Sequence, residues 1–222
     1  MDYKRITIIS GHYGSGKTNI AVNMAYDLKR QKENTAIADL DIVNPYFRTL
    51  DSAEDFRKRG IRLICSPFAN SGVDAPALPQ EMYSITDDMT QSVIIDVGGD
   101  DRGALALGRI SGAIREENDY DMYMVINCFR PLTRTVDELL AVREEIELAG
   151  RIHFTGIINN SNLGRDTQPE DVIRSCEFAE KAAQRMGLEI SATSYDKRLD
   201  EVLRNKVPNP LAMELQELIP GL

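Results

Sequence analysis

Residues Gly11 to Thr18 have the types and the spacing of a loop that holds phosphate groups. They read GHYGSGKT and fit the pattern G-x-x-x-x-G-K-[ST]. Glycines at these positions allow the backbone to curl so that several N–H groups point inward, and a following helix adds partial positive charge. The Lys17 ammonium would reach the β- and γ-phosphates, and the Thr18 hydroxyl would bind Mg²⁺. We therefore expect a nucleoside triphosphate with magnesium in this loop.

The whole loop and the residue after it are candidates for nucleotide contact. These candidates are Gly11, His12, Tyr13, Gly14, Ser15, Gly16, Lys17, Thr18 and Asn19. A glycine turn that fits the pattern by chance is the alternative. The apolar run before the loop and the helical pattern after it favour phosphate binding, because the motif needs a strand, a glycine loop and a helix N-terminus in that order.

Three aspartates follow apolar runs at places suited to a metal ion and an attacking water. Asp96 ends the run SVIID, where a carboxylate would hold a Mg²⁺-bound water beside the phosphate loop. Gly99 completes D-x-x-G, so its N–H could contact a γ-phosphate, and residues 100–102 would form a switch. Asp39 and Asp41 stand two residues apart, so a continuing strand would place both on one face. The alternatives are a plain strand exit for Asp96 and a turn or helix cap for Asp41.

The stretch IINNSN, which ends at Asn162, follows another apolar run and concerns the base. Guanine-reading turns use N-K-x-D, and both the lysine and the aspartate are absent here, so GTP is disfavoured. An asparagine side chain offers the donor and the acceptor that adenine needs. The alternative is that Asn159 and Asn160 only shape the turn.

The pattern along the chain indicates the elements that must position these residues. Short, continuous apolar runs alternate with helical patterns, which predicts an α/β fold with three layers: a mostly parallel sheet with helices on both faces. We expect one domain over residues 1–222, without repeats or a linker. The predicted strands are 5–10, 35–39, 61–65, 92–96, 122–127, 154–159 and, more weakly, 190–193.

Two helices carry clear end signals. Pro169–Met186 is the stronger one, with a capping box expected from Thr167 and Glu170 and a stop at Gly187. A second box, Thr135 with Glu138, predicts a helix that runs to about residue 149 and stops at Gly150. The C-terminal stretch PLAMELQELIPGL is mildly amphipathic, and we expect it to form a last helix. Residues 66–79 read as a long loop, the only obvious candidate for the walls of an acceptor pocket.

The bulk composition excludes some classes of partner. The net charge of −9 is opposite to what a protein needs to displace counterions from nucleic acid, so direct nucleic-acid binding is disfavoured. No run approaches 18 apolar residues, and the C-terminal stretch carries acidic rather than basic charge, so a membrane role is disfavoured too. Cys65, Cys128 and Cys176 lack CxxC spacing, which indicates reduced thiols and a cytoplasmic location.

Most of the chain resembles the ParA/MinD-like ATPases, a deviant Walker A group of the CobQ/CobB/MinD/ParA nucleotide-binding domains. The resemblance is carried, in the family's order, by GSGKTNIAVNMAYDL, AIADLDIVNPYFR, the strand that ends at Asp96, the NN turn and YDKRLDEVLRNKVP. It implies a P-loop NTPase fold with ATP and Mg²⁺. It further implies that Asp39 supports the magnesium shell and Asp41 orients the attacking water. Asn160, or next Asn159, would meet adenine, and Pro208 would lie near the base. The implied catalytic residues are Lys17, Asp41 and Asp96, and the implied metal-site residues are Thr18, Asp39 and Asp96.

The chain departs from that family at the start of the loop. Members usually read K-G-G-x-G-K-T, and the first lysine reaches across a dimer, whereas this chain has His12 and Tyr13 at the first two positions. His12 is either a loop residue without a chemical role or a donor to phosphate. Arg48, in a stretch that resembles a switch, is either an arginine finger or a solvated side chain.

Three functions are compatible with these residues. The first is an ATPase that switches an unidentified protein partner and forms a nucleotide-dependent homodimer. The second is a nucleotide-gated binding module with negligible turnover, to which the missing lysine points. The third is a small-molecule kinase or ATP-dependent ligase, since GSGKT occurs in kinases too.

Overall fold

The strands that the structure describes form one parallel sheet. The computed structural model describes residues 1–40, 52–65, 80–99 and 101–215. Within these ranges the strands are β1 (Ile6–Ser10), β2 (Thr35–Leu40), β3 (Arg62–Cys65), β4 (Ser92–Val97), β5 (Tyr120–Ile126), β6 (Gly156–Asn159), β7 (Glu189–Asp196) and β8 (Pro210–Met213). They lie in the order β3-β2-β4-β1-β5-β6-β7-β8, and every adjacent pair is parallel.

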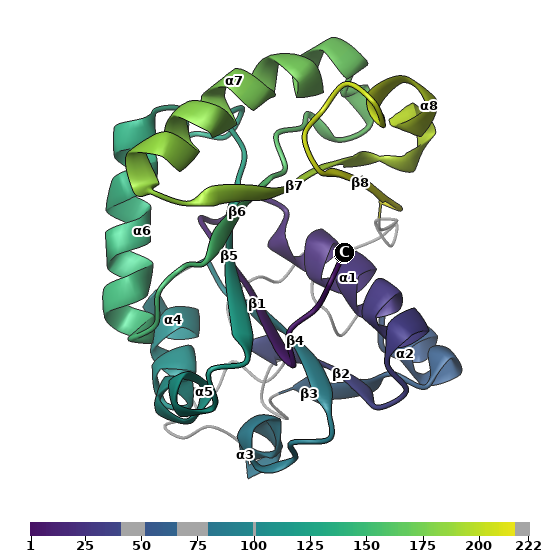
Figure 1. Cartoon of the computed structure of the whole chain (residues 1–222), viewed down its shortest axis with the longest axis vertical. Helices are drawn as coiled ribbons and strands as arrows, with labels where there is room; N and C mark the ends of the chain where they lie inside the picture. Colours follow the sequence, from purple (N-terminus) through teal and green to yellow (C-terminus); the bar gives the residue numbers. More distant parts are fainter. Residues whose placement is uncertain (41–51, 66–79, 100, 216–222) are drawn as a thin grey trace, which may run out of the picture.

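Helices cover both faces of this sheet, as predicted. They are α1 (Lys17–Gln31), α2 (Ala53–Arg59), α3 (Gln80–Asp87), α4 (Asp101–Gly108), α5 (Ser111–Glu117), α6 (Val136–Gly150), α7 (Pro169–Met186) and α8 (Asp200–Leu203). The buried side chains of α1 and α2 join one apolar cluster, and those of α3 to α7 join another on the opposite face. Figure 1 shows this three-layer arrangement, with α1 and α2 on one side of the sheet and α4, α5 and α6 on the other.

Alternation along the strands explains the two clusters. In β1, Ile6 and Ile8 belong to the cluster under α3 to α7, whereas Ile9 belongs to the cluster under α1. All three are fully buried, as expected for a strand that is covered on both faces. A third, smaller cluster joins α7 to the segment around α8.

The order of the strands brings the candidate site together. β1 lies between β4 and β5, so the chain leaves β1 toward β2 on one side and later returns to β5 on the other. At such a switch point the loops that follow neighbouring parallel strands diverge and open a crevice at the carboxyl edge. The loops after β1, β4, β5 and β6 all reach this edge.

Two helix ends differ from their predicted caps. α7 has the predicted bounds and ends at Gly187 (φ 64°), but its capping box consists of Gln168 and Asp171. The Thr167 hydroxyl is engaged elsewhere, because it donates to the Gly164 carbonyl (2.6 Å) and accepts from the Leu163 N–H (2.8 Å).

The capping box of Thr135 and Glu138 at the start of α6 is confirmed, but the helix ends one residue later than predicted. Gly150 is still helical, and Arg151 takes the left-handed conformation (φ 53°). Gly108 of α4 lies against the end of α6, where a Cβ would be only 2.6 Å from the Ala149 carbonyl oxygen. Because glycine has no Cβ, α4 and α6 can approach each other closely at this point.

The predicted C-terminal helix is wrong over Pro210–Met213, which forms strand β8 beside β7. Pairing with β7 satisfies the backbone and buries Met213 against the α1 cluster. Glu214 then hydrogen-bonds Asn23 of α1 through its backbone N–H and carbonyl, both at 2.9 Å. These tertiary contacts override the weak helical pattern. Residues 216–222 lie outside the described ranges. Among the helices that are described, none is both long and apolar enough to cross a membrane.

Candidate functional site

The phosphate loop (residues 11–18) connects β1 to α1 and depends on its glycines. Gly11, Gly14 and Gly16 have positive φ angles of 141°, 76° and 91°, which only glycine adopts readily. A Cβ on Gly11 would lie 2.5 Å from the Val125 carbonyl oxygen. Gly16 is the N-cap of α1, so the first helical N–H groups face the inside of the loop. This curled backbone fits a phosphate group.

Gly99, which follows β4, closes against the same loop. A Cβ at this position would lie 2.5 Å from the Tyr13 nitrogen and 2.8 Å from the Lys17 Nζ atom. No other residue type fits there without moving the loop. The D-x-x-G glycine of the sequence therefore lies beside the phosphate loop, close enough for its backbone to take part in the site.

The side chains of Ser15, Lys17 and Thr18 in the loop are buried. Lys17 is 5% exposed, and its ammonium donates to the His12 carbonyl (3.2 Å) inside the loop. Thr18 is also buried, and the buried Ser15 hydroxyl has no hydrogen-bond partner within the described ranges. A buried hydroxyl left over in this way fits a loop that encloses a ligand rich in acceptors. At the mouth, Tyr13 is exposed and the half-buried His12 ring contacts the Tyr13 carbonyl (3.0 Å).

Asp39 and Asp96 lie opposite each other on neighbouring strands. They are direct register partners of β2 and β4, and both are buried. Asp96 is also in register with Ile9 of β1, one residue before that strand ends. Two carboxylates at this edge, with the Thr18 hydroxyl, are the oxygen donors that Mg²⁺ prefers. Within the described ranges, no three His, Cys, Asp or Glu side chains lie together as a candidate metal site. Asp41 and Arg48 lie outside the described residues.

Cys65 is the register partner of Asp39 on β3. Burial, with the nearby negative charge of Asp39, raises the pKa of the Cys65 thiol. The shift favours the neutral form of the thiol. Asp39 and Asp96 contribute carboxylate oxygens at this edge.

Asn159 ends β6 and is fully buried. Its Nδ2 donates to the Ser175 hydroxyl of α7 (2.9 Å), and its Oδ1 accepts from the Ser161 hydroxyl (2.8 Å) and backbone N–H (3.2 Å). These bonds fix the turn after β6. They fit the turn-shaping alternative for Asn159.

Asn160 lies directly behind the phosphate loop. Its Nδ2 donates to the Ser15 carbonyl (2.6 Å), and its Oδ1 accepts from the Ser194 hydroxyl of β7 (2.7 Å). A Cβ on Gly16 would lie 2.3 Å from that Nδ2. Asn160 therefore stabilises the phosphate loop through its hydrogen bond to the Ser15 carbonyl.

A groove at the carboxyl ends of β7 and β8 lies on the Asn160 side of the site. It is lined by Arg165, Asp196, Lys197, Arg198, Glu214 and Leu215. Arg198 holds its walls together, because its guanidinium donates to the Arg165 and Thr167 carbonyls, both at 2.7 Å. Pro208 is exposed in the bend before β8 and is not among the residues that line this groove.

The turn after β5 was not singled out in the sequence, yet it borders the phosphate loop. Asn127 follows β5 as Asn159 follows β6, which is the one signal that could have pointed to it. Its Oδ1 accepts from the Phe129 N–H (3.0 Å), and its Nδ2 donates to the Asn162 carbonyl (3.2 Å). Farther along, the Cδ atom of Arg130 lies 4.0 Å from the position of a Cβ on Gly14.

Solved structures of other proteins share this fold. The cell division protein FtsY of Thermotoga maritima is 15% identical, with a TM-score of 0.57 over 83% of this chain and 59% of that one. The signal recognition particle 54 kDa protein of Aeropyrum pernix, in complex with GDP, is 15% identical, with a TM-score of 0.55 over 86% and 41%. This chain thus spans well under two thirds of either protein. At this identity the likeness concerns the fold alone.

A sequence-family comparison is more specific. No curated protein matches the chain. The family of CobQ/CobB/MinD/ParA nucleotide-binding domains matches residues 6–187. This match includes the phosphate loop, both aspartate strands and the turn after β6, so it agrees with the resemblance read from the motifs. The chain therefore belongs to the CobQ/CobB/MinD/ParA nucleotide-binding domain family.

Proposed function

We propose that this protein is a Mg²⁺-dependent ATPase of the ParA/MinD-like class, in which the bound nucleotide sets the shape of a surface that binds a protein partner. One observation carries the proposal. The glycine cradle of residues 11–18, with the buried Lys17, lies at the same sheet edge as the register pair Asp39 and Asp96. Phosphate-binding amides, a cation and metal-binding carboxylates are the parts that phosphoryl transfer needs.

In this proposal each group has a stated task. The loop amides and Lys17 bind the β- and γ-phosphates, and Gly99 contacts the γ-phosphate through its backbone. Thr18, Asp39 and Asp96 would hold Mg²⁺, which neutralises negative charge on the phosphates when bound. Asp41 orients a water whose oxygen forms a bond to the γ-phosphorus. The bond between that phosphorus and the β–γ bridging oxygen breaks, which yields ADP, inorganic phosphate and a proton.

We propose ATP rather than GTP because the turn after β6 has neither the lysine nor the aspartate of a guanine-reading turn. The groove beside Arg198 would receive the base. Asn160 contributes either by contacting adenine with its remaining N–H or by supporting the loop alone. A substitution that separates these two roles is described in the Discussion.

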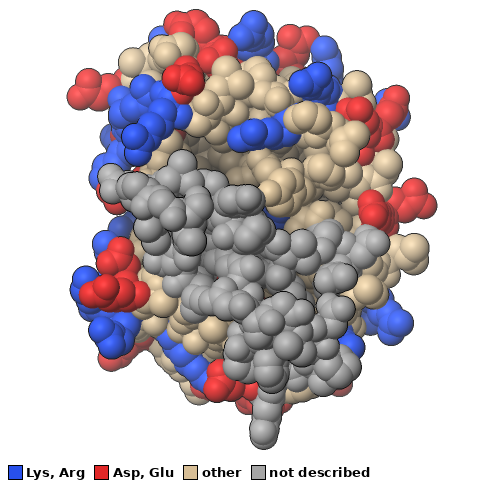
Figure 2. Space-filling view, turned by 180° about the vertical axis from the view of Figure 1, so that it is seen from behind, with Lys and Arg blue, Asp and Glu red and all other residues tan. Residues whose placement is uncertain are grey.

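A protein, including a second copy of this chain, is the proposed partner. Figure 2 shows the face opposite to that of Figure 1, where Lys, Arg, Asp and Glu side chains lie around the margin and the hollow, whose described walls are mostly uncharged, also holds Lys or Arg side chains. The described residues on this face form no continuous basic surface of the kind that grips nucleic acid. The three cysteines are free thiols, which fits a cytoplasmic location.

The central test is nucleotide binding by the purified protein with and without Mg²⁺. We expect Mg²⁺-dependent binding of ATP, and we expect Lys17→Ala to weaken it at least about tenfold, because a hydrogen bond to a charged group is lost. Lys32→Ala, an exposed lysine just after the same helix, is the control and should bind as the wild type does. Unchanged binding by Lys17→Ala would refute the proposal.

Turnover then separates the three functions. Phosphate release well above that of Asp41→Ala supports the ATPase. Release equal to that of Asp41→Ala, with binding intact, would instead identify a nucleotide-gated binding module. Release that rises strongly with one small molecule would identify a kinase or ligase.

A further inference from the structure

We propose that Arg130, in the turn after β5, contacts the terminal phosphate of the nucleotide and so provides a second fixed positive charge beside Lys17. This inference rests on the proposed function, because it assumes a triphosphate in the loop of residues 11–18. It concerns a residue that no motif of the sequence includes.

The position of Arg130 follows from one contact with the phosphate loop. Its Cδ atom lies 4.0 Å from where a Cβ on Gly14 would be, so the aliphatic stem lies beside the loop at this glycine. Gly14 has a φ of 76° and lies between the exposed Tyr13 and the buried Ser15, at the transition from the mouth of the loop to its interior. The guanidinium starts one bond beyond Cδ and is therefore at the rim of the cradle.

The turn that carries Arg130 is held by several hydrogen bonds. The Arg130 N–H donates to the Asn127 carbonyl (3.1 Å), and the Thr133 hydroxyl donates to the carbonyls of Asn127 (2.9 Å) and Arg130 (3.3 Å). Leu132, which lies between Arg130 and Thr133 in the chain, takes a left-handed conformation with a φ of 64°. The Cys128 N–H donates to the Ser161 hydroxyl (3.1 Å), which ties the turn to the loop after β6. A backbone fixed in this way keeps the arginine beside the loop.

The chemistry of arginine suits this place. Its guanidinium is always charged and presents several N–H donors in one plane, which match phosphate oxygens. Arg130 is exposed, and no ion pair to it occurs within the described ranges. Its charge is thus not neutralised by a described carboxylate. An added cation at the terminal phosphate favours the triphosphate over the diphosphate.

The test compares affinities for ATP and ADP, both with Mg²⁺, by calorimetry on the full chain. We expect Arg130→Ala to weaken ATP binding about fivefold or more and ADP binding less than about twofold. Arg130→Lys should keep part of the preference, because it keeps the charge and loses the planar donor set. The matched control is Arg134→Ala, an exposed arginine four residues farther along the same segment, for which we expect no change.

Each outcome bears on one claim. An ATP-to-ADP affinity ratio that is the same in Arg130→Ala as in the wild type overturns the inference while the proposed function stands. Equal losses for ATP and ADP, together with a lower melting temperature, also overturn it, because they describe damage to the turn. If the wild type binds no nucleotide, the proposed function itself fails before any variant is compared.

Discussion

At the scale of the residue, Asn160 joins three segments, two through its side-chain amide and one through its backbone. It donates to the Ser15 carbonyl of the phosphate loop and accepts from the Ser194 hydroxyl of β7, and its own backbone N–H donates to the Ile126 carbonyl at the end of β5 (2.9 Å). A buried amide with two protein partners stabilises the geometry around it, because leaving either partner unsatisfied is costly.

We predict that Asn160→Ala lowers the free energy of unfolding by about 1–3 kcal/mol, because it removes the hydrogen bond to the Ser15 carbonyl and leaves the buried Ser194 hydroxyl with only its longer bond to the Asn159 carbonyl (3.3 Å). Urea unfolding measures this loss. The same variant decides the role of the amide toward the base. If Asn160 only supports the loop, the affinities for ATP and GTP fall together, whereas adenine recognition would require the ATP affinity to fall more.

The backbone conformation of residues 11–18 could be predicted from the sequence because its constraints are local. Glycine, lysine and threonine at fixed spacing carry the loop, and Gly11, Gly14 and Gly16 have the positive φ angles that such a loop needs. The partners of Asn159 and Asn160 could not be predicted in this way. Ser175 and Ser194 lie on α7 and β7, and only the folded sheet brings them beside the turn after β6.

At the scale of the elements, Arg5 connects the start of β1 to α5 and to the segment that includes the end of α3 and the residues before β4. Its buried guanidinium forms an ion pair with Glu117 at the end of α5 and donates to the Ile85 and Gln91 carbonyls, both at 3.0 Å. Both side chains of the pair are about nine-tenths buried. This cluster fixes α3 and α5 against the residue just before β1, at the edge of the sheet opposite to the phosphate loop.

We predict that Arg5→Met lowers the free energy of unfolding by about 3–5 kcal/mol, because Glu117 is left as a buried charge without its partner. Lys4→Met is the matched control: its ion pair with Asp119 is 3.8 Å long and exposed, so its loss should cost less than about 1 kcal/mol. Urea unfolding of both variants checks the difference, and a loss below about 1 kcal/mol for Arg5→Met would contradict the assignment. Arg5→Met with Glu117→Gln should recover part of the loss.

The elements themselves were predictable where the pattern was strong. Each of the seven predicted strands exists, because continuous runs of Ile, Val and Met leave few alternatives in a chain of this composition. β8 was missed, since Pro210–Met213 is too short for a clear pattern and its strand conformation depends on pairing with β7. The capping box of α7 was misplaced by one residue because Thr167 and Gln168 both offer a cap, and the local turn engages Thr167.

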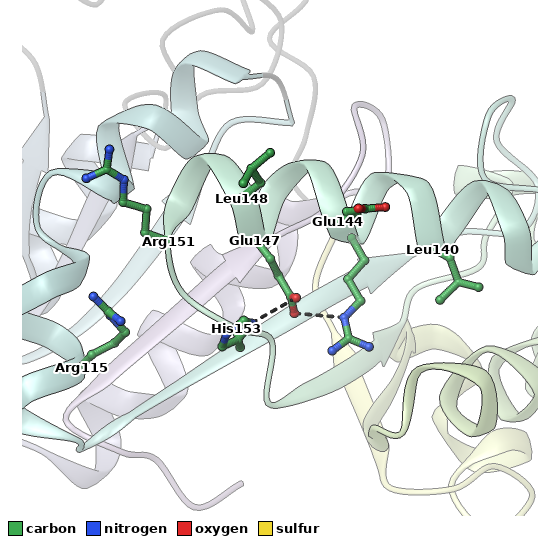
Figure 3. A pocket seen from close by; sticks show the side chains of 8 residues that line it. Arg115, Leu140, Glu144, Glu147, Leu148, Arg151 and His153 are labelled. Atoms are coloured by element: carbon green, nitrogen blue, oxygen red, sulfur yellow. Dashed lines mark hydrogen bonds and ion pairs between the residues drawn. The ribbon is translucent and has the colours of Figure 1, made fainter.

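At the scale of the whole molecule, acidic side chains that accept hydrogen bonds make stability depend on pH. Glu147 of α6 is the clearest case and lies in a groove on the α6 face, between His153 and Arg143 (Figure 3). Although burial alone would raise its pKa, hydrogen bonds from the Phe154 N–H, Arg143 and His153, with the positive charge of Arg143, hold the pKa of Glu147 below its usual value. The bonds are 3.0 to 3.1 Å long.

A carboxyl group with a lowered pKa in the folded state stabilises the protein above its unfolded-state pKa and loses this contribution as the pH falls through the folded-state value. We therefore predict that Glu147→Gln lowers the free energy of unfolding by about 1–2 kcal/mol at pH 7 and that the difference from the wild type shrinks below about pH 4.5. Thermal unfolding of both proteins between pH 7 and pH 3 measures it. A difference independent of pH would contradict the prediction.

The central place of β1 has a consequence for how the protein is made. The ribosome releases this strand first, yet its two neighbours in the sheet, β4 and β5, emerge much later, and the asparagine that supports the phosphate loop comes later still. Throughout that interval the apolar side chains of β1 have no sheet to join. Nascent chains arrested before residue 126 should therefore lack a stable phosphate cradle, and protection of β1 from proteolysis should begin only after β5 has left the exit tunnel.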